Sequence, residues 1–409
     1  MAIKTEKGQA VILIVFALIG LIGITALTVD GSMAYSDRRH AQNAADSAAF
    51  AGALANSKNE DIETAAQNIA TTNGYNDNGT TNDVVITFVD SPNGTCPHDN
   101  AGNKDIKVEI TSHINTFFAP IVGVQTLTNK VNAVTRACGM YVAPLFGGNA
   151  VVGLSPNTDT CAFDSGNSNA ANWVLIGGGI FSNGCAYSKN EDSVTLDPLE
   201  CIFTVGEASN FSCQVENQTS EAINYPADIL AIMPPNPCDG TAGDVGLPQP
   251  ATSGGSVTLS NGVYCITDFD EYDGTDIILN NATLYVTDLD FDVKFAGGGG
   301  FQGSPTTTGI YSSYYMVVAY DPTPCEGFSD NGSQRLEYRG NGGIGDTLYG
   351  TVLAPSACID FRGNANGEAV HSQIIGYNVS SNGEAGVTIN YEEEENRRDP
   401  VYPNIELLK

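Results

Sequence analysis

The chain has 409 residues, a hydrophobic content of 42% and a net charge of −30. A protein this acidic repels nucleic acid, so we exclude binding to nucleic acid or another polyanion as its function. The low charged fraction of 16%, with 45 glycines and 18 prolines, argues against a disordered chain or a helical bundle and indicates a folded protein with many turns and much β structure.

The first predicted element is an apolar helix over Ala10–Val29, which contains no charged residue. A stretch of about 20 such residues matches a helix that crosses about 30 Å of hydrocarbon. A removed signal peptide is the alternative, but its apolar stretch normally runs about 7 to 15 residues. Lys4 and Lys7 precede the stretch and Asp30 follows it, which favours a cytoplasmic stub at residues 1–9 and the rest of the chain outside. We therefore predict a membrane-anchored protein.

The helical pattern continues beyond the apolar stretch, with no proline from Gly31 to about Asn73. In AQNAADSAAFAGALA the small residues recur at helical spacing on one narrow face, which would let another helix approach closely. Two interpretations stay open: a lone anchor with an alanine-rich stalk, or a helix that packs against copies of itself or a partner. We favour the second, with these residues as the assembly helix: Gly20, Gly23, Asp30, Ala41, Ala45, Ala48 and Gly52.

Three segments after this helix show the alternation of apolar and polar residues that is typical of strands. They are Asp83–Asp90, Asp105–Ile114 and Thr126–Ala137. Together with the helix they predict a small, pilin-like α+β module over residues 30–142, built from one long helix and a small antiparallel sheet.

The N-terminal residues resemble a known family. Val29–Gly31 closes the apolar helix, Tyr35 and the pair Arg38–Arg39 follow, and the block QNAADSAA occupies Gln42–Ala49. This order resembles the N-terminal segment of TadE/TadG-like Flp (tight adherence) pilus-assembly proteins. The resemblance implies export, membrane insertion and other pilus subunits as partners, and it implies no enzymatic chemistry. Pseudopilin relatives of this family are cut after a glycine in the stub, which makes Gly8 the candidate processing site.

From residue 143 to 391, short β-branched or aromatic runs are separated by Gly, Asn, Asp and Ser. Successive coils of a parallel β-helix produce this pattern, because tight corners need residues that tolerate left-handed dihedrals. Hairpin dipeptides at the regular spacing of a β-sandwich are scarce. We predict an all-β domain over 143–391, a parallel β-helix with a β-sandwich as the alternative. Phrases such as LSNGVYC and GTVLAPSACIDFRGN resemble the β-helical extracellular regions joined to TadG-like N-termini.

All ten cysteines lie beyond the apolar stretch, and none has metal-binding spacing. An even number of cysteines outside the cytoplasmic stub indicates disulfides in an oxidising compartment, and the sequence leaves their pairing open. The disulfide candidates are Cys96, Cys138, Cys161, Cys185, Cys201, Cys213, Cys238, Cys265, Cys325 and Cys358.

The search for metal-binding or catalytic residues gives one pattern. In DLDFDV the carboxylates of Asp288, Asp290 and Asp292 alternate along a predicted strand, so they share a face as calcium ligands would; a solvated acidic face gives the same pattern. The four histidines lie far apart in the sequence, which argues against a zinc site. We therefore predict no catalytic residue and no cofactor; the three carboxylates are interpreted as a solvated face, with a calcium site as the alternative.

The final segment, residues 392–409, begins with four consecutive glutamates and is predicted as an acidic exposed tail. Docking of this tail on a neighbouring molecule, through its apolar residues Ile405, Leu407 and Leu408, is the alternative.

These features predict a non-enzymatic structural protein of the cell surface. Its most concrete form is a TadG-like pilus-associated subunit that assembles through its N-terminal helix and displays a β-helical domain for adhesion to an unspecified surface ligand. The main subunit of an extracellular filament is one alternative. A secreted calcium-dependent polysaccharide-active β-helix enzyme is another, and it would draw on the acidic residues together with Arg335, Arg339 and Arg362.

Overall fold

The computed structural model describes residues 9–96, 102–157, 159–166, 172–196, 202–212, 215–217, 222–239, 255–267, 275–287, 292–295, 301–325, 334–339, 348–362, 370–382, 386–401 and 405–408. The chain forms two compact units. The first comprises Met1–Val142 together with Pro400–Lys409, and the second is Ala143–Asp399. The second unit is therefore inserted into the sequence of the first.

The first unit begins with a 49-residue helix, α1 (Gln9–Ser57). Asn59, with φ of 57°, follows its end, and the side chain of Asp61 then caps α2 (Ile62–Thr72) by accepting the backbone N–H of Thr64 at 2.7 Å. The sequence pattern predicted one helix to about Asn73. The structure divides it in two, because a left-handed residue and a new N-cap interrupt the backbone hydrogen bonds.

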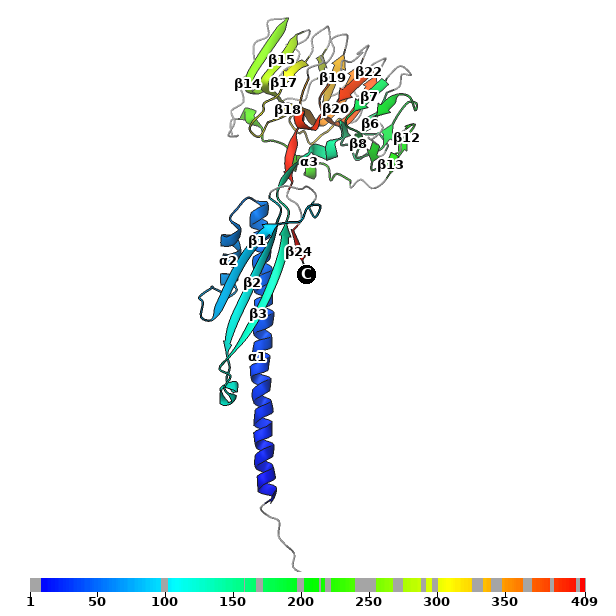
Figure 1. Cartoon of the computed structure of the whole chain (residues 1–409). Helices are drawn as coiled ribbons and strands as arrows, with labels where there is room; N and C mark the ends of the chain where they lie inside the picture. The colour runs from blue at the N-terminus through cyan, green and yellow to red at the C-terminus, as the bar shows by residue number, and fades with distance from the viewer. Residues whose placement is uncertain are drawn as a thin grey trace, which may run out of the picture. The chain divides into compact units, whose positions relative to one another are not determined.

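A four-stranded antiparallel sheet completes the first unit. Its order is β1 (Asn82–Asp90), β2 (Lys104–Asn115), β3 (Thr126–Ala137) and β24 (Ile405–Leu408). The sheet packs along the second half of α1, whereas the first half extends past the end of the sheet (Figure 1). The predicted α+β layout is confirmed.

Strand β24 lies where the sequence analysis placed an exposed tail. It pairs antiparallel with β3, with Ile405 opposite Ala137 and Leu408 opposite Val134. The Ile405 side chain packs beside Ala53, Ile106 and Ala137 of the same unit. The apolar end of the chain therefore completes its own sheet.

The second unit is rich in short strands. A two-stranded sheet of β4 (Tyr141–Pro144) and β23 (Arg398–Val401) forms where the chain enters and leaves it. The remaining strands in chain order are β5 (Val151–Gly153), β6 (Phe163–Asp164), β7 (Asn172–Ile176), β8 (Ile180–Ser182), β9 (Ala186–Tyr187), β10 (Val194–Leu196), β11 (Ile202–Thr204), β12 (Ala208–Ser209), β13 (Val215–Asn217), β14 (Ser256–Ile266), β15 (Asp276–Val286), β16 (Asp292–Phe295), β17 (Phe301–Ser304), β18 (Tyr314–Val318), β19 (Arg335–Arg339), β20 (Thr351–Arg362), β21 (Ile374–Asn382) and β22 (Gly386–Asn390).

Short helical turns connect some of these strands. In the second unit they are α3 (Ala227–Ile232) and the 3₁₀ turns η2 (Leu145–Gly148), η3 (Pro237–Asp239) and η5 (Glu393–Glu395). In the first unit the 3₁₀ turn η1 (Ala119–Val122) lies between β2 and β3.

Every pairing that the structure describes among β5 to β22 is parallel. The main path of the largest sheet runs β13-β11-β8-β5-β21-β20-β18-β15-β14. The first strand of the unit, β5, therefore lies beside β21, with Val151 opposite Ile374. Because strands from its beginning and end are neighbours, the unit can be inserted into another domain without stretching either connection.

The core of the second unit lies between these parallel strands (Figure 1). Trp173 is fully buried there, with its ring edge-on to Phe163 and Phe361 at centroid distances of 5.3 and 5.4 Å. Its indole N–H donates to the hydroxyl of Ser381 at 3.0 Å, so its polar atom is satisfied as well.

The expectation of disulfides is confirmed for eight of the ten cysteines. The pairs are Cys96–Cys138, Cys161–Cys185, Cys238–Cys265 and Cys325–Cys358. The first lies in the first unit and the other three in the second. Cys201 and Cys213 lie outside the described residues.

Candidate assembly and membrane interface

The first half of α1 presents apolar side chains on all sides. Between Val11 and Val29 its large residues are exposed, among them Leu13 at 69% and Leu27 at 76%. Within the described residues, α1 is the one helix long and apolar enough to span a membrane, with a mean hydropathy of 2.8 and no burial in its most apolar window. An apolar surface of this extent needs lipid or another protein to cover it.

Gly20 and Gly23 lie within this exposed half. No heavy atom outside the helix backbone lies within 4 Å of where a Cβ would stand on either residue. The groove that these glycines leave on the helix surface is therefore open to a neighbouring helix.

The alanine face of α1 is covered by the chain's own sheet and α2, whereas the sequence analysis favoured another copy of the chain or a partner. Ala41, Ala45 and Ala48 are fully buried against β-strands of the same unit and α2. A Cβ on Gly52 would stand 3.2 Å from Ile106 and 3.3 Å from Ile62. The small residues do allow close approach, as predicted, but the surface that approaches them is the chain's own sheet and α2. They are not available for contact with another chain in this structure.

Asp30 lies where the exposed and covered halves of α1 meet. Its carboxylate accepts three consecutive backbone N–H groups from the loop after β2: Phe117 at 2.8 Å, Phe118 at 3.1 Å and Ala119 at 2.8 Å. Ala119 is the first residue of η1, and Phe117 and Phe118 come just before it, so the carboxylate accepts the backbone donors at the N-terminal end of this 3₁₀ turn. Asp30 is 5% exposed, and this arrangement favours its ionised form.

A second carboxylate, Asp37, repeats the contact two helical turns further along α1. It accepts the hydroxyl of Ser112 on β2 and the side-chain amide of Asn129 on β3, the latter at 2.8 Å. Burial and the charge of Asp37 raise the pKa of Tyr75, whose hydroxyl donates to Asp37 at 3.4 Å. Asp37 was not among the predicted site residues, although its seven-residue spacing from Asp30 places both on one face of the helix.

An ion pair between Arg136 and Asp105 connects two strands of the sheet in the first unit. The Arg136 guanidinium donates to both carboxylate oxygens of Asp105 at 2.8 and 2.9 Å, and this holds the pKa of the Asp105 carboxyl below its ordinary value. Asp105 on β2 and Arg136 on β3 lie directly opposite each other, so this ion pair links the two strands.

The tip of the β2–β3 hairpin is apolar and exposed. Phe117 is 70% exposed, Ile121 84% and Val124 41%. The chain carries no charged side chain between His113 and Lys130, although its net charge is −30. Because Asp30 holds the backbone of this tip, the exposed apolar side chains lie beside the end of the apolar half of α1.

Several other predicted site residues lie outside the described residues. These are Gly8 and the calcium candidates Asp288 and Asp290, together with the side chain of Asp292, whose backbone begins β16. Among the arginines considered for a polysaccharide-active enzyme, Arg335 lies 3.3 Å from Asp360 and Arg362 lies 2.6 Å from Glu337. Both carboxylates are fully buried, so these arginines neutralise charge inside the second unit.

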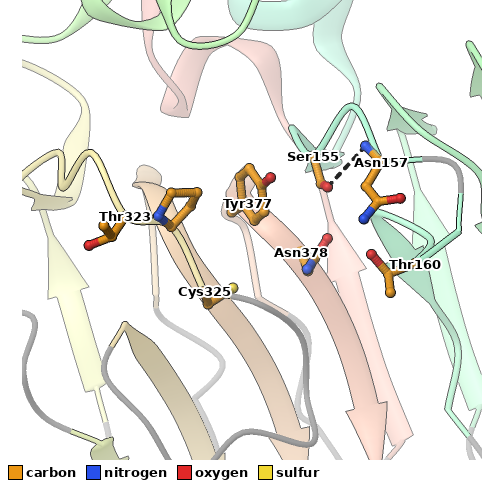
Figure 2. Close-up of a pocket in the computed structure, with 8 residues that line it drawn as sticks. Ser155, Asn157, Thr160, Thr323, Cys325, Tyr377 and Asn378 are labelled. Carbon is orange, nitrogen blue, oxygen red and sulfur yellow. Dashed lines mark hydrogen bonds between the residues drawn. The ribbon is translucent and has the colours of Figure 1, made fainter.

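The second unit also carries a polar hollow of about 470 Å³. Figure 2 shows side chains from separate loops and from β21 around it, with Tyr377 and Asn378 on one wall and Asn157 and Thr160 on another. The backbone N–H of Asn157 donates to Ser155 at 3.3 Å. None of the lining side chains is charged, and its cysteine, Cys325, is in a disulfide. The described lining therefore offers neutral hydrogen-bonding groups.

Comparison with known proteins bears on α1. Residues 8–55 match the family model described as putative Flp pilus-assembly TadE/G-like. The resemblance of the N-terminal segment is thus confirmed, and the strand-rich remainder is consistent with it. No curated protein and no solved structure matches the chain. The matched segment covers Gly20, Gly23, Asp30 and the buried alanines.

Asp30→Asn should release the hairpin tip. The amide keeps one acceptor oxygen and turns an NH₂ donor toward backbone N–H groups, so at least one of them loses its partner. We expect hydrogen exchange at Phe117 and Ala119 to accelerate about tenfold or more, with little change in the middle of β2. Asp46→Asn is the matched control, because Asp46 lies on α1 and accepts only the Gln42 side chain among the bonds described. Equal exchange in both variants would contradict the role given to Asp30.

Proposed function

We propose that this protein is a membrane-anchored, pilus-associated structural subunit of the TadG-like type, which assembles through the first half of α1 and displays its second unit at the cell surface. The observation that carries the proposal is the contrast along α1: the large apolar residues from Val11 to Val29 are exposed, whereas Ala41, Ala45 and Ala48 are buried against the chain's own sheet and α2. The family match over residues 8–55 supports a role in pilus assembly rather than in catalysis.

Contacts with other subunits are assigned to the exposed half alone. Gly20 and Gly23 offer the close approach that helix packing in lipid uses. The hydroxyls of Thr25 and Thr28 donate to the carbonyls of Leu21 and Ile24, each at 2.8 Å, so these polar groups are satisfied within the helix and tolerate a lipid or helix neighbour.

The anchor in this proposal has a second part, the hairpin tip. Its exposed Phe117 and Ile121 lie next to the end of the spanning stretch, and the chain carries no charged side chain between His113 and Lys130. Aromatic and aliphatic side chains at that level are well suited to the boundary between lipid headgroups and acyl chains. The tip would then fix the depth and the rotation of α1 in the bilayer, since Asp30 joins the two.

The proposed orientation places the N-terminal stub in the cytoplasm and both units outside. Four disulfides spread over the two units fit an oxidising compartment. Processing after Gly8 would remove none of α1, which begins at Gln9.

For the second unit we propose coils of a parallel β-helix. A β-sandwich is built from antiparallel sheets, whereas the described pairings from β5 to β22 are all parallel. Such a rigid stack would serve as the displayed, ligand-contacting part of the subunit, with adhesion as its role.

Tryptophan fluorescence tests the placement of the tip. In full-length Phe117→Trp protein reconstituted in phosphatidylcholine vesicles, brominated acyl chains should quench the new tryptophan. The native Trp173 is fully buried and supplies a constant background. Phe88→Trp is the control, because Phe88 is 47% exposed and pairs with Ile106 toward the other end of β2. Quenching that is absent at 117, or equal in both variants, would show that the tip faces water or protein.

Cross-linking in membranes tests assembly through the apolar half. Gly20→Leu should fill the open groove and reduce the cross-linked species that contain this chain, while the protein stays in the membrane fraction. Thr25→Leu is the control, since it lies about 140° around the helix from Gly20. Recovery of the wild-type chain as the main component of purified filaments would instead identify it as the filament subunit, and a monomer in both variants and the wild type would refute assembly through this helix.

A further inference from the structure

An imidazole and two carboxylates converge in the second unit, away from the segments discussed so far. Nδ1 of His371 lies 3.9 Å from Oε1 of Glu392 and 3.6 Å from Oε2 of Glu395. One ligand atom from each of the three side chains lies within 4.8 Å of the other two. The three side chains thus point toward a common centre.

Two of these atoms are buried and have no hydrogen-bond partner among the residues that the structure describes: Nδ1 of His371 and Oε2 of Glu395. They face each other at a distance too long for a good hydrogen bond. A cation at the common centre would satisfy both atoms.

The backbone around the cluster is held in place by one buried residue. The Asn396 side chain, 1% exposed, donates to the carbonyls of His371 at 3.1 Å and Glu392 at 2.9 Å, and it accepts the N–H of Gln373 at 2.7 Å. The 3₁₀ turn η5 sets Glu392 and Glu395 three residues apart, which aligns them on one side of the turn. The ring of Tyr349 lies against the imidazole with a centroid distance of 4.9 Å.

We propose that His371, Glu392 and Glu395 bind a divalent transition-metal ion, with Zn²⁺ as the best fit. Tetrahedral Zn²⁺ takes nitrogen and carboxylate oxygen at about 2.0 to 2.2 Å, which sets neighbouring ligand atoms about 3.4 Å apart. The two distances from Nδ1 exceed this by only a few tenths of an ångström. The imidazole nitrogen favours Zn²⁺ over Ca²⁺ or Mg²⁺, which prefer oxygen ligands alone. Two carboxylates balance the charge of the ion, and water would fill the fourth position.

Bound metal would fasten the segment that leaves the second unit. Glu392 and Glu395 follow β22, the last strand of the unit's parallel sheets, whereas His371 precedes β21. The ion would therefore tie residues 392–395 to the segment that leads into β21. In the sequence the histidine and the glutamates are about 20 residues apart, and the run of four glutamates is typical of a solvated face, so the pattern gives no metal-binding signal.

Metal binding can be measured on the full chain in detergent by isothermal titration with ZnCl₂ and by the visible spectrum of bound Co²⁺. We expect one site per chain, with the intense Co²⁺ bands of tetrahedral geometry. His371→Ala and Glu395→Gln should each weaken affinity about tenfold or more. Glu394→Gln is the matched control: it removes the same charge from the same run, and Glu394 is exposed and outside the cluster. Its affinity should change less than twofold.

Three results would overturn the proposal. One is the absence of a stoichiometric Zn²⁺ site in the wild-type chain. The second is an equal loss of affinity in the Glu394→Gln and Glu395→Gln variants, which would indicate diffuse attraction to an acidic run. The third is equal affinity for Ca²⁺ and Zn²⁺, which would mean that the imidazole takes no part. Circular dichroism of each variant shows that it is folded before titration.

Discussion

The carboxylate of Asp30 is the interaction on which the first unit depends. An isolated buried charge is costly, and here it is balanced by the backbone N–H groups of Phe117, Phe118 and Ala119. The contact joins residues 87 to 89 positions apart in sequence, so it fixes the β2–β3 hairpin to one level of α1. That level is the border between the apolar stretch and the covered part of the helix. The contact thereby joins the folded part of the first unit to the apolar stretch of α1 at a single level.

Both halves of α1 carry small residues, but these residues pack against the chain's own sheet in one half and are exposed in the other. Beyond Asp30 the alanines bring the helix close to a sheet, where a larger side chain would force the strands away. Before Asp30 the glycines leave a groove that no residue in the described part of the chain fills. The difference between the halves is the partner, not the residue type. This is why a stripe of small residues by itself does not tell an intramolecular surface from an assembly surface.

Local patterns in the sequence predicted the local elements well. The apolar helix and strands β1 to β3 lie where hydrophobic periodicity placed them, because each is set by residues close in sequence. Contacts between distant segments were not predictable in this way. The burial of Ala45, the pairing of β24 with β3 and the convergence of His371 on Glu395 depend on chain segments that meet only in the folded protein. Asp30 was among the predicted residues, but its partners at Phe117 to Ala119 were not.

The insertion of the second unit gives the protein a modular design. Strands from the two ends of the unit lie side by side at β5 and β21, and the chain then returns to complete the first unit with β24. The second unit can therefore be replaced without altering the contact between Asp30 and the β2–β3 hairpin.

Membrane anchoring and assembly through α1 both require that the mature protein keep the apolar stretch. Intact mass and N-terminal sequencing of the protein recovered from cell membranes measure this directly. We expect a species that contains all of residues 10–29, with an N-terminus at Gln9 or earlier. A species that starts near Gly31 and is recovered as a freely diffusing monomer would contradict both the anchor and the assembly helix.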